Sequence, residues 1–341
     1  MVVPLQGPGG IFGPSCIAVS EFACQELNAR NGIAGRRVEM EYIDGGQELS
    51  RVAADVSALL DAGRIDALSG WHISSVRHHL VPIIRGRIPY VYTSLYEGGE
   101  CRPNVYCSGE TPEQQIYPAL RWLRDNLGIR SWYVVGADYV WPRRTYSMIK
   151  HFCSALGIEI SGASFVPMGQ ADDPRLPTAA AASGCDAVLT LLVGQDAVDF
   201  NRCFAADGLY EQILRYSPLM EENMLLAGGP ETTGNLYASA AYFRTLITEP
   251  SMQFIGDYAD GNGGVAPALN NMAESCYQGI YTLSHLARRA GGLDATGCDA
   301  GIDGLSFDSP RGPVKFEGNQ AQQQIYLARA DGVDFDVVAS L

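Results

Sequence analysis

Apolar and polar residues alternate in long blocks along this chain, and the blocks predict strands separated by helices. Apolar runs predict buried parallel strands at 2–5, 67–70, 89–93, 131–136, 187–193 and 236–243. More polar, alternating runs at 37–43 and 160–166 predict strands nearer a sheet edge. Helical spacing is seen first at Cys16, Val19, Ala23 and Leu27, and again near 48–62, 74–84, 112–127, 142–156, 172–183, 196–207 and 267–290. This alternation predicts a doubly wound α/β architecture.

The strand–helix pattern occurs twice, which predicts two Rossmann-like lobes with a ligand cleft between them. One set fills 1–110, and a second set begins after it. Because the helix at 267–290 follows the second set, we expect it to return to the first lobe, so that several crossings form a hinge, near 108–113, 243–249 and 309–314. The predicted N-terminal lobe is 1–109 plus 246–311, and the C-terminal lobe is 110–245 plus 312–341. A final hairpin is expected around Gly318-Asn319, joining 314–316 to 324–330.

Length and charge restrict the class of protein. The 341 residues are enough for two domains with separate cores. A formal net charge of −14 argues against nucleic-acid binding, which needs a Lys/Arg face, and against docking on an anionic membrane. The sequence contains no run of about 18 apolar residues, so no segment is expected to span the bilayer. The start of the chain has no leader pattern, and 1–5 instead resembles the middle of a first strand.

The nine cysteines are an odd number for a secreted disulfide framework. Five fall in helical patterns, where small buried apolar residues are expected: Cys16, Cys24, Cys153, Cys203 and Cys276. Cys101 and Cys107 flank a turn and are candidates for a local disulfide. The chain has no Cys-x-x-Cys pair, so we expect neither a zinc nor a redox site, and the compartment stays open.

The motifs of catalysis are absent from the sequence. The glycine-rich segment 7–13 opens a helix but lacks the Lys-Ser/Thr of a nucleotide loop, so a structural turn is the better interpretation. Gly-x-Ser-x-Gly does not occur, and no pair of carboxylates forms an acid/base couple. His72, His78 and His79 lack the spacing of metal ligands. We therefore expect no catalytic residue, no metal and no cofactor.

Aromatic and hydroxyl side chains instead follow three predicted strands. The segments are Gly70-Trp71-His72-Ile73-Ser74-Ser75, Tyr96-Glu97-Gly98-Gly99 and Gly136-Ala137-Asp138-Tyr139-Val140-Trp141-Pro142. Ligands of open α/β sheets bind outside the carboxyl ends of the strands, so these segments predict a small-molecule site. Ser74 is either a plain N-cap or a ligand contact. Asp138 is expected to cap a helix, and Glu221 either meets a ligand or lies at a solvated helix start.

Taken together, these segments resemble the type I periplasmic-binding-protein family. The resemblance runs through most of the chain and is closest to the urea and short-chain-amide binders and to the amide-sensing regulator of aliphatic amidase. Tyr-Glu-Gly at 96–98 and Asp-Tyr-x-Trp-Pro at 138–142 are its more specific elements. Residues 28–36 carry a motif of the wider family, and residues 103–105 and 307–314 also contribute to the resemblance.

The resemblance implies a set of ligand contacts. Ser74, Tyr96 and Tyr139 would face the ligand, with Trp71 or His72 on one wall and Trp141 on the other. Val193, Met220 and Glu221 would close the second lobe onto it. The chain departs from the amide sensor at His72, where that group tends to carry Tyr, and at Leu219-Met220, which replace a Thr-rich stretch. These departures leave ligand identity open.

The expected function is a non-catalytic receptor that closes on a small polar molecule. Tyr and Ser hydroxyls in an aromatic cage suit a neutral amide or urea. The first role is the substrate-binding component of an ABC importer outside the cytoplasm, with a permease as partner. Alternatives are a cytoplasmic amide-sensing regulator, an amino-acid binder that uses Ser74, Ser75 and Thr93 for the carboxylate and Glu221 for the ammonium, and, least favoured, an amide hydrolase. A homodimer is possible.

Overall fold

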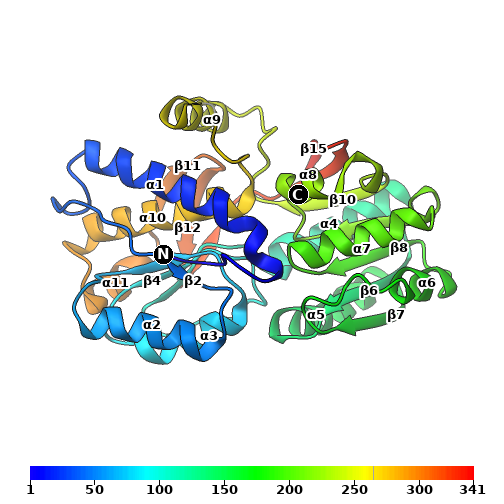
Figure 1. Ribbon diagram of the computed structural model, residues 1–341, viewed down its shortest axis with the longest axis horizontal. Helices are drawn as coiled ribbons and strands as arrows, with labels where there is room; N and C mark the ends of the chain where they lie inside the picture. Colours follow the sequence, from blue (N-terminus) through cyan, green and yellow to red (C-terminus); the bar gives the residue numbers. More distant parts are fainter. Residues whose placement is uncertain (264) are drawn as a thin grey trace. The chain divides into compact units, whose positions relative to one another are not determined.

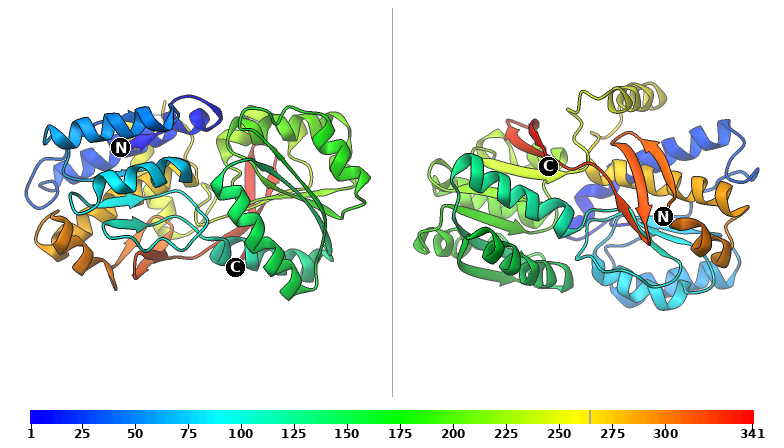
Figure 2. Two further views of the ribbon diagram at one scale, coloured as in Figure 1. Left: turned by 90° about the horizontal axis from the view of Figure 1, so that it is seen from below. Right: turned by 180° about the vertical axis from the view of Figure 1, so that it is seen from behind.

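The computed structural model describes residues 1–263 and 265–341 and divides them into two units. Unit 1 consists of Met1–Gln6, Phe12–Glu110 and Ile247–Gln324. Unit 2 consists of Gly7–Ile11, Thr111–Leu246 and Ile325–Leu341. Each unit has its own sheet flanked by helices, as Figure 1 and Figure 2 show. The predicted two-lobed α/β class is therefore confirmed.

Unit 1 is built on a six-stranded sheet of order β11-β12-β13-β5-β4-β3. Its parallel part is β3 (Leu68–Gly70), β4 (Tyr90–Tyr92), β5 (Val105–Cys107) and β13 (Gln320–Gln322); β11 (Ser306–Ser309) and β12 (Gly312–Glu317) are antiparallel. A separate parallel pair is formed by β1 (Val2–Val3) and β2 (Ile43–Asp44). The helices are α1 (Gly13–Ala29), α2 (Leu49–Asp61), α3 (Ser74–Ile84), α9 (Glu249–Asn262), α10 (Asn271–Ala290) and α11 (Ala295–Ile302).

Successive residues of β4 point to opposite faces of the sheet, as expected for a strand. Tyr90 and Tyr92 pack in the core that α2 and α3 cover, whereas Val91 packs in the core that α10 and α11 cover. Figure 1 shows α2 and α3 on one side of the unit 1 strands and α1 and α10 on the other. Because both faces are covered, the central strands are apolar throughout.

Unit 2 has a seven-stranded sheet of order β15-β14-β10-β9-β8-β6-β7. The parallel strands are β6 (Ser131–Ala137), β7 (Glu159–Val166), β8 (Ala187–Leu191), β9 (Leu214–Ser217) and β10 (Leu236–Ala240). β14 (Tyr326–Asp331) and β15 (Asp334–Ser340) add antiparallel at one edge. The helices are α4 (Pro112–Leu127), α5 (Val140–Leu156), α6 (Arg175–Ala182), α7 (Gln195–Ala206) and α8 (Glu222–Gly228).

Three details differ from the sequence expectations. β12 and β13 extend the unit 1 sheet beside β5, so 312–324 lies with unit 1 instead of the predicted C-terminal lobe. The predicted second arm of the final hairpin is wrong: β12 turns at Gly318-Asn319 into β13, whereas β14 pairs with β10 and β15. The predicted strands at 2–5 and 37–43 are reduced to two residues each.

The helix predicted at 267–290 is α10, and it packs against α1, β3 and β4 of unit 1 as expected.

The suggested disulfide between Cys101 and Cys107 is not formed. Cys107 lies in the buried core at β5, whereas Cys101 is exposed, and both are free thiols. Over 1–263 and 265–341, no helix is both long and apolar enough to span a membrane.

Candidate ligand-binding site

Trp71 follows β3 and is 2 % exposed. Its ring meets the Phe12 ring edge-on, with centroids 4.7 Å apart. The indole Nε1 is buried and has no hydrogen-bond partner among the residues that the structure describes. Because a buried donor without a partner is costly, we expect this N–H to gain an acceptor in the working protein.

His72 holds the loop after β3 against the loop after β4. Its N–H donates to Ser94 Oγ at 2.9 Å, and its C=O accepts from Tyr92 Oη at 2.8 Å. The imidazole Nε2 lies 2.8 Å from Tyr90 Oη. Burial lowers the pKa of His72 to about 3, so the ring is neutral. The side chain therefore supports the loop from within the core.

Ser74 and Glu97, which follow β3 and β4, belong to a buried ionic network centred on Arg77. Ser74 Oγ donates to Glu97 Oε2 at 2.7 Å, and Arg77 Nη2 donates to Glu97 Oε1 at 2.6 Å. Arg77 Nε lies 3.3 Å from Glu100 Oε2. Burial would raise the pKa of Glu97, but the His78 hydrogen bond and the charge of Arg77 outweigh it and lower the pKa to about 2.

Tyr96 packs beside this network. The guanidinium of Arg77 lies over the rings of both Tyr92 and Tyr96, 4.8 and 4.7 Å from their centroids, which is cation–π geometry. Tyr96 Oη donates to Gln320 Oε1 at 2.7 Å. The Tyr-Glu-Gly segment therefore has a structural role in addition to the ligand contact predicted for Tyr96, which stays a prediction.

Helix starts at the carboxyl ends of the strands share one feature. Six helices follow a parallel strand of their own unit and have no side-chain cap at the N-terminus among the described residues: α1, α2, α3, α5, α7 and α8. At the start of α6, Arg175 N–H donates to Asp173 Oδ1 at 2.9 Å. Of the remaining helices, α4, α10 and α11 are capped by Thr111, Asn270 and Asp294, whereas α9 has no side-chain cap. The first backbone N–H groups of an uncapped helix are free to bind ligand oxygens.

In unit 2 the predicted residues lie at the ends of the adjacent strands β9, β8 and β6. Tyr139 is half-buried and Trp141 is buried, with ring centroids 6.3 Å apart. Val193, Met220 and Glu221 are buried. Gly194 has φ +53°, and a Cβ there would meet Pro8 O at 2.0 Å, so the turn into α7 requires glycine.

Asp138 bonds to the side chain of Arg143 at 2.7 Å and gives α5 no side-chain cap. Sequence reasoning also missed Arg77, although it stands three residues after Ser74 on α3, where two side chains share a helix face. The ligand contacts predicted at the strand ends of both units stay predictions. No group of three or more His, Cys, Asp or Glu suited to a metal is found in the described parts of the chain.

These two α/β units, each with polar loops at the strand ends, define a two-lobed solute-binding protein. The family model described as periplasmic binding protein matches residues 1–334, so the chain belongs to that family. Its relative in Brucella melitensis biotype 1, Leu/Ile/Val-binding protein homolog 6, is 23% identical over 345 residues, covering 97% of this chain and 87% of that protein.

Solved structures share the fold at low identity. A solute-binding protein of an ABC transporter from R. palustris, in complex with benzoate, has a TM-score of 0.85 and 20% identity, covering 99% of this chain and 94% of that one. The branched-chain amino acid transporter substrate-binding protein of Streptococcus pneumoniae, in complex with isoleucine, has a TM-score of 0.88 and 13% identity, covering 100% and 97%. A periplasmic binding protein from Burkholderia mallei has a TM-score of 0.88 and 17% identity, covering 100% and 93%.

Proposed function

We propose that this chain is the substrate-binding component of an ABC importer, acting outside the cytoplasm with a membrane permease as its partner. The observation that carries this proposal is the set of uncapped helix starts at the strand ends, together with the unpartnered indole N–H of Trp71. Among the residues that the structure describes, these helix starts have no side-chain acceptor and the indole N–H has none. A solute with a carbonyl or carboxylate oxygen supplies the missing acceptor.

The first candidate solute is a small neutral amide or urea. The cation beside the unit 1 strand ends, Arg77, is already paired with Glu97 and Glu100, and His72 is neutral. A neutral molecule needs donors and acceptors but no counter-charge, so this environment suits it. The benzoate and isoleucine of the related structures carry carboxylate oxygens, which are acceptors of the same kind.

A branched-chain or other amino acid is the second candidate solute. Glu221 is a buried carboxylate at the end of β9, where an ammonium group would find a counter-charge. Ser74 is bonded to Glu97, whereas Thr93 Oγ1 is buried without a hydrogen-bond partner among the described residues. Because one of the three hydroxyls of the carboxylate clamp, that of Ser74, is already bonded to Glu97, the amide is favoured modestly over the amino acid.

A cytoplasmic amide sensor is a second candidate role, and the thiols favour it. All nine cysteines are free, as in proteins of reducing compartments. Fusing the natural gene's complete N-terminal coding region to a reporter active only outside the cytoplasm separates the two roles. Reporter activity supports the importer, and its absence supports the sensor.

The solute is tested by thermal shift and then by calorimetry with urea, acetamide, butyramide, benzoate, leucine and isoleucine. At about 100 times its Kd, a ligand adds roughly 2.7 kcal/mol of stability, which gives a clear rise in Tm. A rise with amides or urea alone supports the neutral solute. A rise with the amino acids moves Glu221 into the site, and a rise with none of the six contradicts a small carbonyl solute.

A matched pair of variants tests the donor at Trp71. Trp71→Phe removes the indole N–H and should raise Kd about fivefold, the equivalent of about 1 kcal/mol for one hydrogen bond. Trp132→Phe is the control, because Trp132 is also buried with an unpartnered indole Nε1 among the described residues but lies within β6. Equal Kd values for the two variants would remove Trp71 from the site.

A further inference from the structure

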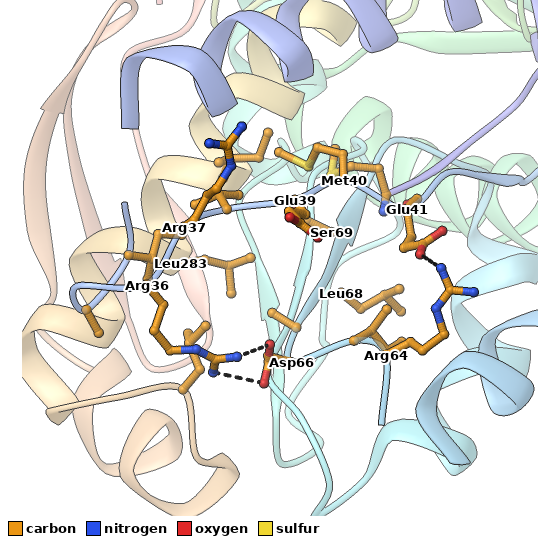
Figure 3. A pocket seen from close by; sticks show the side chains of 18 of the residues that line it. Arg36, Arg37, Glu39, Met40, Glu41, Arg64, Asp66, Leu68, Ser69 and Leu283 are labelled. Carbon is orange, nitrogen blue, oxygen red and sulfur yellow. Dashed lines mark hydrogen bonds and ion pairs between the residues drawn. The ribbon is translucent and has the colours of Figure 1, made fainter. Parts of the chain in front are cut away.

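Charged side chains of unit 1 pair in two different ways. Figure 3 shows the common way, Arg36 with Asp66 and Arg64 with Glu41, among the side chains that line a cavity of about 520 Å³. Each of these pairs joins one cation to one carboxylate at the surface, where ion pairs contribute little to stability. Arg311 is different, because two carboxylates face it inside the protein.

Arg311, Glu110 and Glu274 form this buried trio. Arg311 Nη1 lies 3.7 Å from Glu110 Oε1, and Arg311 Nη2 forms an ion pair with Glu274 Oε2. All three side chains are 0 % exposed. If both carboxylates were ionised, one positive charge would face two negative charges, and the trio would be negative away from water. Burying an unbalanced charge is costly, and one bound proton removes the imbalance.

No second cation balances the trio among the residues that the structure describes. The charged groups that act on Glu274 are Arg311 and Glu110. Other titratable side chains on the elements packed against α10 are Cys16, Glu21, Cys24 and Glu26 on α1, Tyr90 and Tyr92 on β4, Glu249, Asp257, Tyr258 and Asp260 on α9, Cys298 and Asp299 on α11, and Asp308, Lys315 and Glu317 on β11 and β12. Lys315 is the one cation in that list, and it is exposed and paired with Glu317. On α10 itself, the first cationic side chain is at 285, about three turns beyond Glu274.

Glu274 is the member of the trio that shows the imbalance. Its Oε1 is buried and has no hydrogen-bond partner among the described residues. Burial raises the pKa of Glu274; the charge and hydrogen bond of Arg311 act in the opposite direction without cancelling this effect, and Glu110 adds to it. Two carboxylates that face one site typically keep one proton, which belongs to the pair.

The trio is bonded to the loop that carries Tyr96. Glu110 is the last residue of its segment of unit 1, and its C=O accepts from the Tyr96 N–H at 3.0 Å. Arg311 Nη1 donates to Gln323 Oε1 at 3.4 Å, and Gln323 Nε2 donates to Ser108 O at 3.1 Å. The charge state of the trio therefore bears on the order of 108–110 and of the Tyr96 loop.

We propose that Glu110 and Glu274 together bind one proton at neutral pH, which makes the trio with Arg311 neutral, and that loss of this proton loosens 108–110 and the Tyr96 loop. The proton leaves a carboxyl oxygen for water or buffer. An unfolded Glu, with a pKa of 4.5, has already lost its proton at this pH. The unfolding equilibrium constant should therefore rise about tenfold per pH unit above pH ~5, until the folded pair itself loses the proton.

The test is urea unfolding of the full chain from pH 5.5 to 8. All proteins carry Glu222→Gln, since Glu222 is another buried carboxyl, with a pKa of about 7. Glu274→Gln has the shape of a protonated Glu, so it should fold and should reduce the rise of the unfolding constant by about tenfold per pH unit. Glu110→Gln should do the same. Glu317→Gln is the control: its side chain is 61% exposed, and the rise should stay as in the parent.

The outcomes of these variants decide the proposal. Equal pH dependence in the parent and in both single variants overturns it, and so does failure of both single variants to fold. Glu110→Gln combined with Glu274→Gln leaves Arg311 buried without a counter-charge, so its unfolding constant at pH 7 should exceed that of either single variant by about 100-fold or more. If the single variants already show this loss, each carboxylate is needed in its ionised form and the proposal fails.

Hydrogen exchange at the Tyr96 amide reads the loop directly, because this N–H is bonded to Glu110 O. After correction for the intrinsic effect of pH, its opening constant should rise with pH by up to about tenfold per unit in the parent. In Glu274→Gln the opening constant should stay level. The same pH dependence of this amide in both proteins overturns the coupling of the proton to the loop, even where urea unfolding differs.

Discussion

Glu97→Gln is the substitution that most directly tests the buried network beneath the unit 1 strand ends. The side chains of Arg77 and Glu97 are 2 % and 1 % exposed. Breaking such a pair leaves a buried charge and typically costs about 3–5 kcal/mol. Glu100 still faces Arg77 Nε at 3.3 Å, so the lower end of that range, about 3 kcal/mol, applies here.

The pKa of Glu97 gives a second route to this magnitude. It falls from 4.5 to about 2 in the folded protein. That difference corresponds to about 3 kcal/mol, since each pKa unit is worth 1.36 kcal/mol. Because the folded pKa is the lower one, the stabilisation is complete above pH 4.5 and is lost as pH falls toward 2. The cost of Glu97→Gln should therefore be about 3 kcal/mol at pH 7 and much smaller near pH 2.5.

Urea unfolding at pH 7, 5, 3.5 and 2.5, read by tryptophan fluorescence and circular dichroism, measures this difference. Glu317→Gln serves as the control, because Glu317 is 61% exposed and its ion pair with Lys315 lies at the surface, where such pairs contribute little. A loss below about 1 kcal/mol at pH 7, or a loss that does not change with pH, would refute the account of this network.

Three further predictions concern single side chains. Ser74→Ala should lower the free energy of unfolding by about 1 kcal/mol through its lost bond to Glu97; a change in Kd without a change in unfolding would make Ser74 a ligand contact alone. Trp141→Ala should weaken solute binding by a few kcal/mol in calorimetry if this ring is an aromatic anchor, and an unchanged Kd would remove it from the site. Burial raises the pKa of Glu222 to about 7, so stability is lost as pH rises from 4.5 through 7. Glu222→Gln should therefore be more stable than the parent by up to about 3 kcal/mol at pH 8 and equal to it at pH 4, and the opposite trend in urea unfolding would contradict it.

Elements with strong periodicity were predictable from the sequence alone. The helices expected at 74–84 and 112–127 are α3 and α4 at those limits, because each begins beside a Ser or Thr and repeats apolar residues at helical spacing. In contrast, α9 was missed because its 14 residues bury only Ser251, Phe254 and Tyr258. β5 is three residues long and has no room for a pattern.

The sequence predicted that the candidate residues follow strands, but it did not predict which residues they contact. The strand ends that carry Trp71, Ser74 and Tyr96 lie where parallel topology puts them. The partner of Ser74 is Glu97, 23 residues away, and the partner of Tyr96 is Gln320, 224 residues away. A single sequence shows which side chains reach a sheet edge but does not show which of them are already bonded to one another.

The residue types at the helix starts can be read from the sequence without knowing which distant side chains are bonded to one another. Ser, Thr, Asp and Asn at an N-cap each stabilise a helix by about 1 kcal/mol relative to Ala, so a capping residue would also stabilise a helix that follows a strand. Here the N-caps of α3, α5 and α7 are Ile73, Tyr139 and Gly194, and none gives a side-chain cap within the described residues. If a solute binds at these helix starts, as proposed, it supplies acceptors for these N–H groups, and part of the free energy of capping becomes free energy of binding. Thr111, Asn270 and Asp294 cap α4, α10 and α11, so the chain does place capping residues at other helix starts, although α9 has none. A missing side-chain cap at a strand end therefore predicts a solute contact there, and this prediction needs a binding measurement because α9 also begins without a side-chain cap.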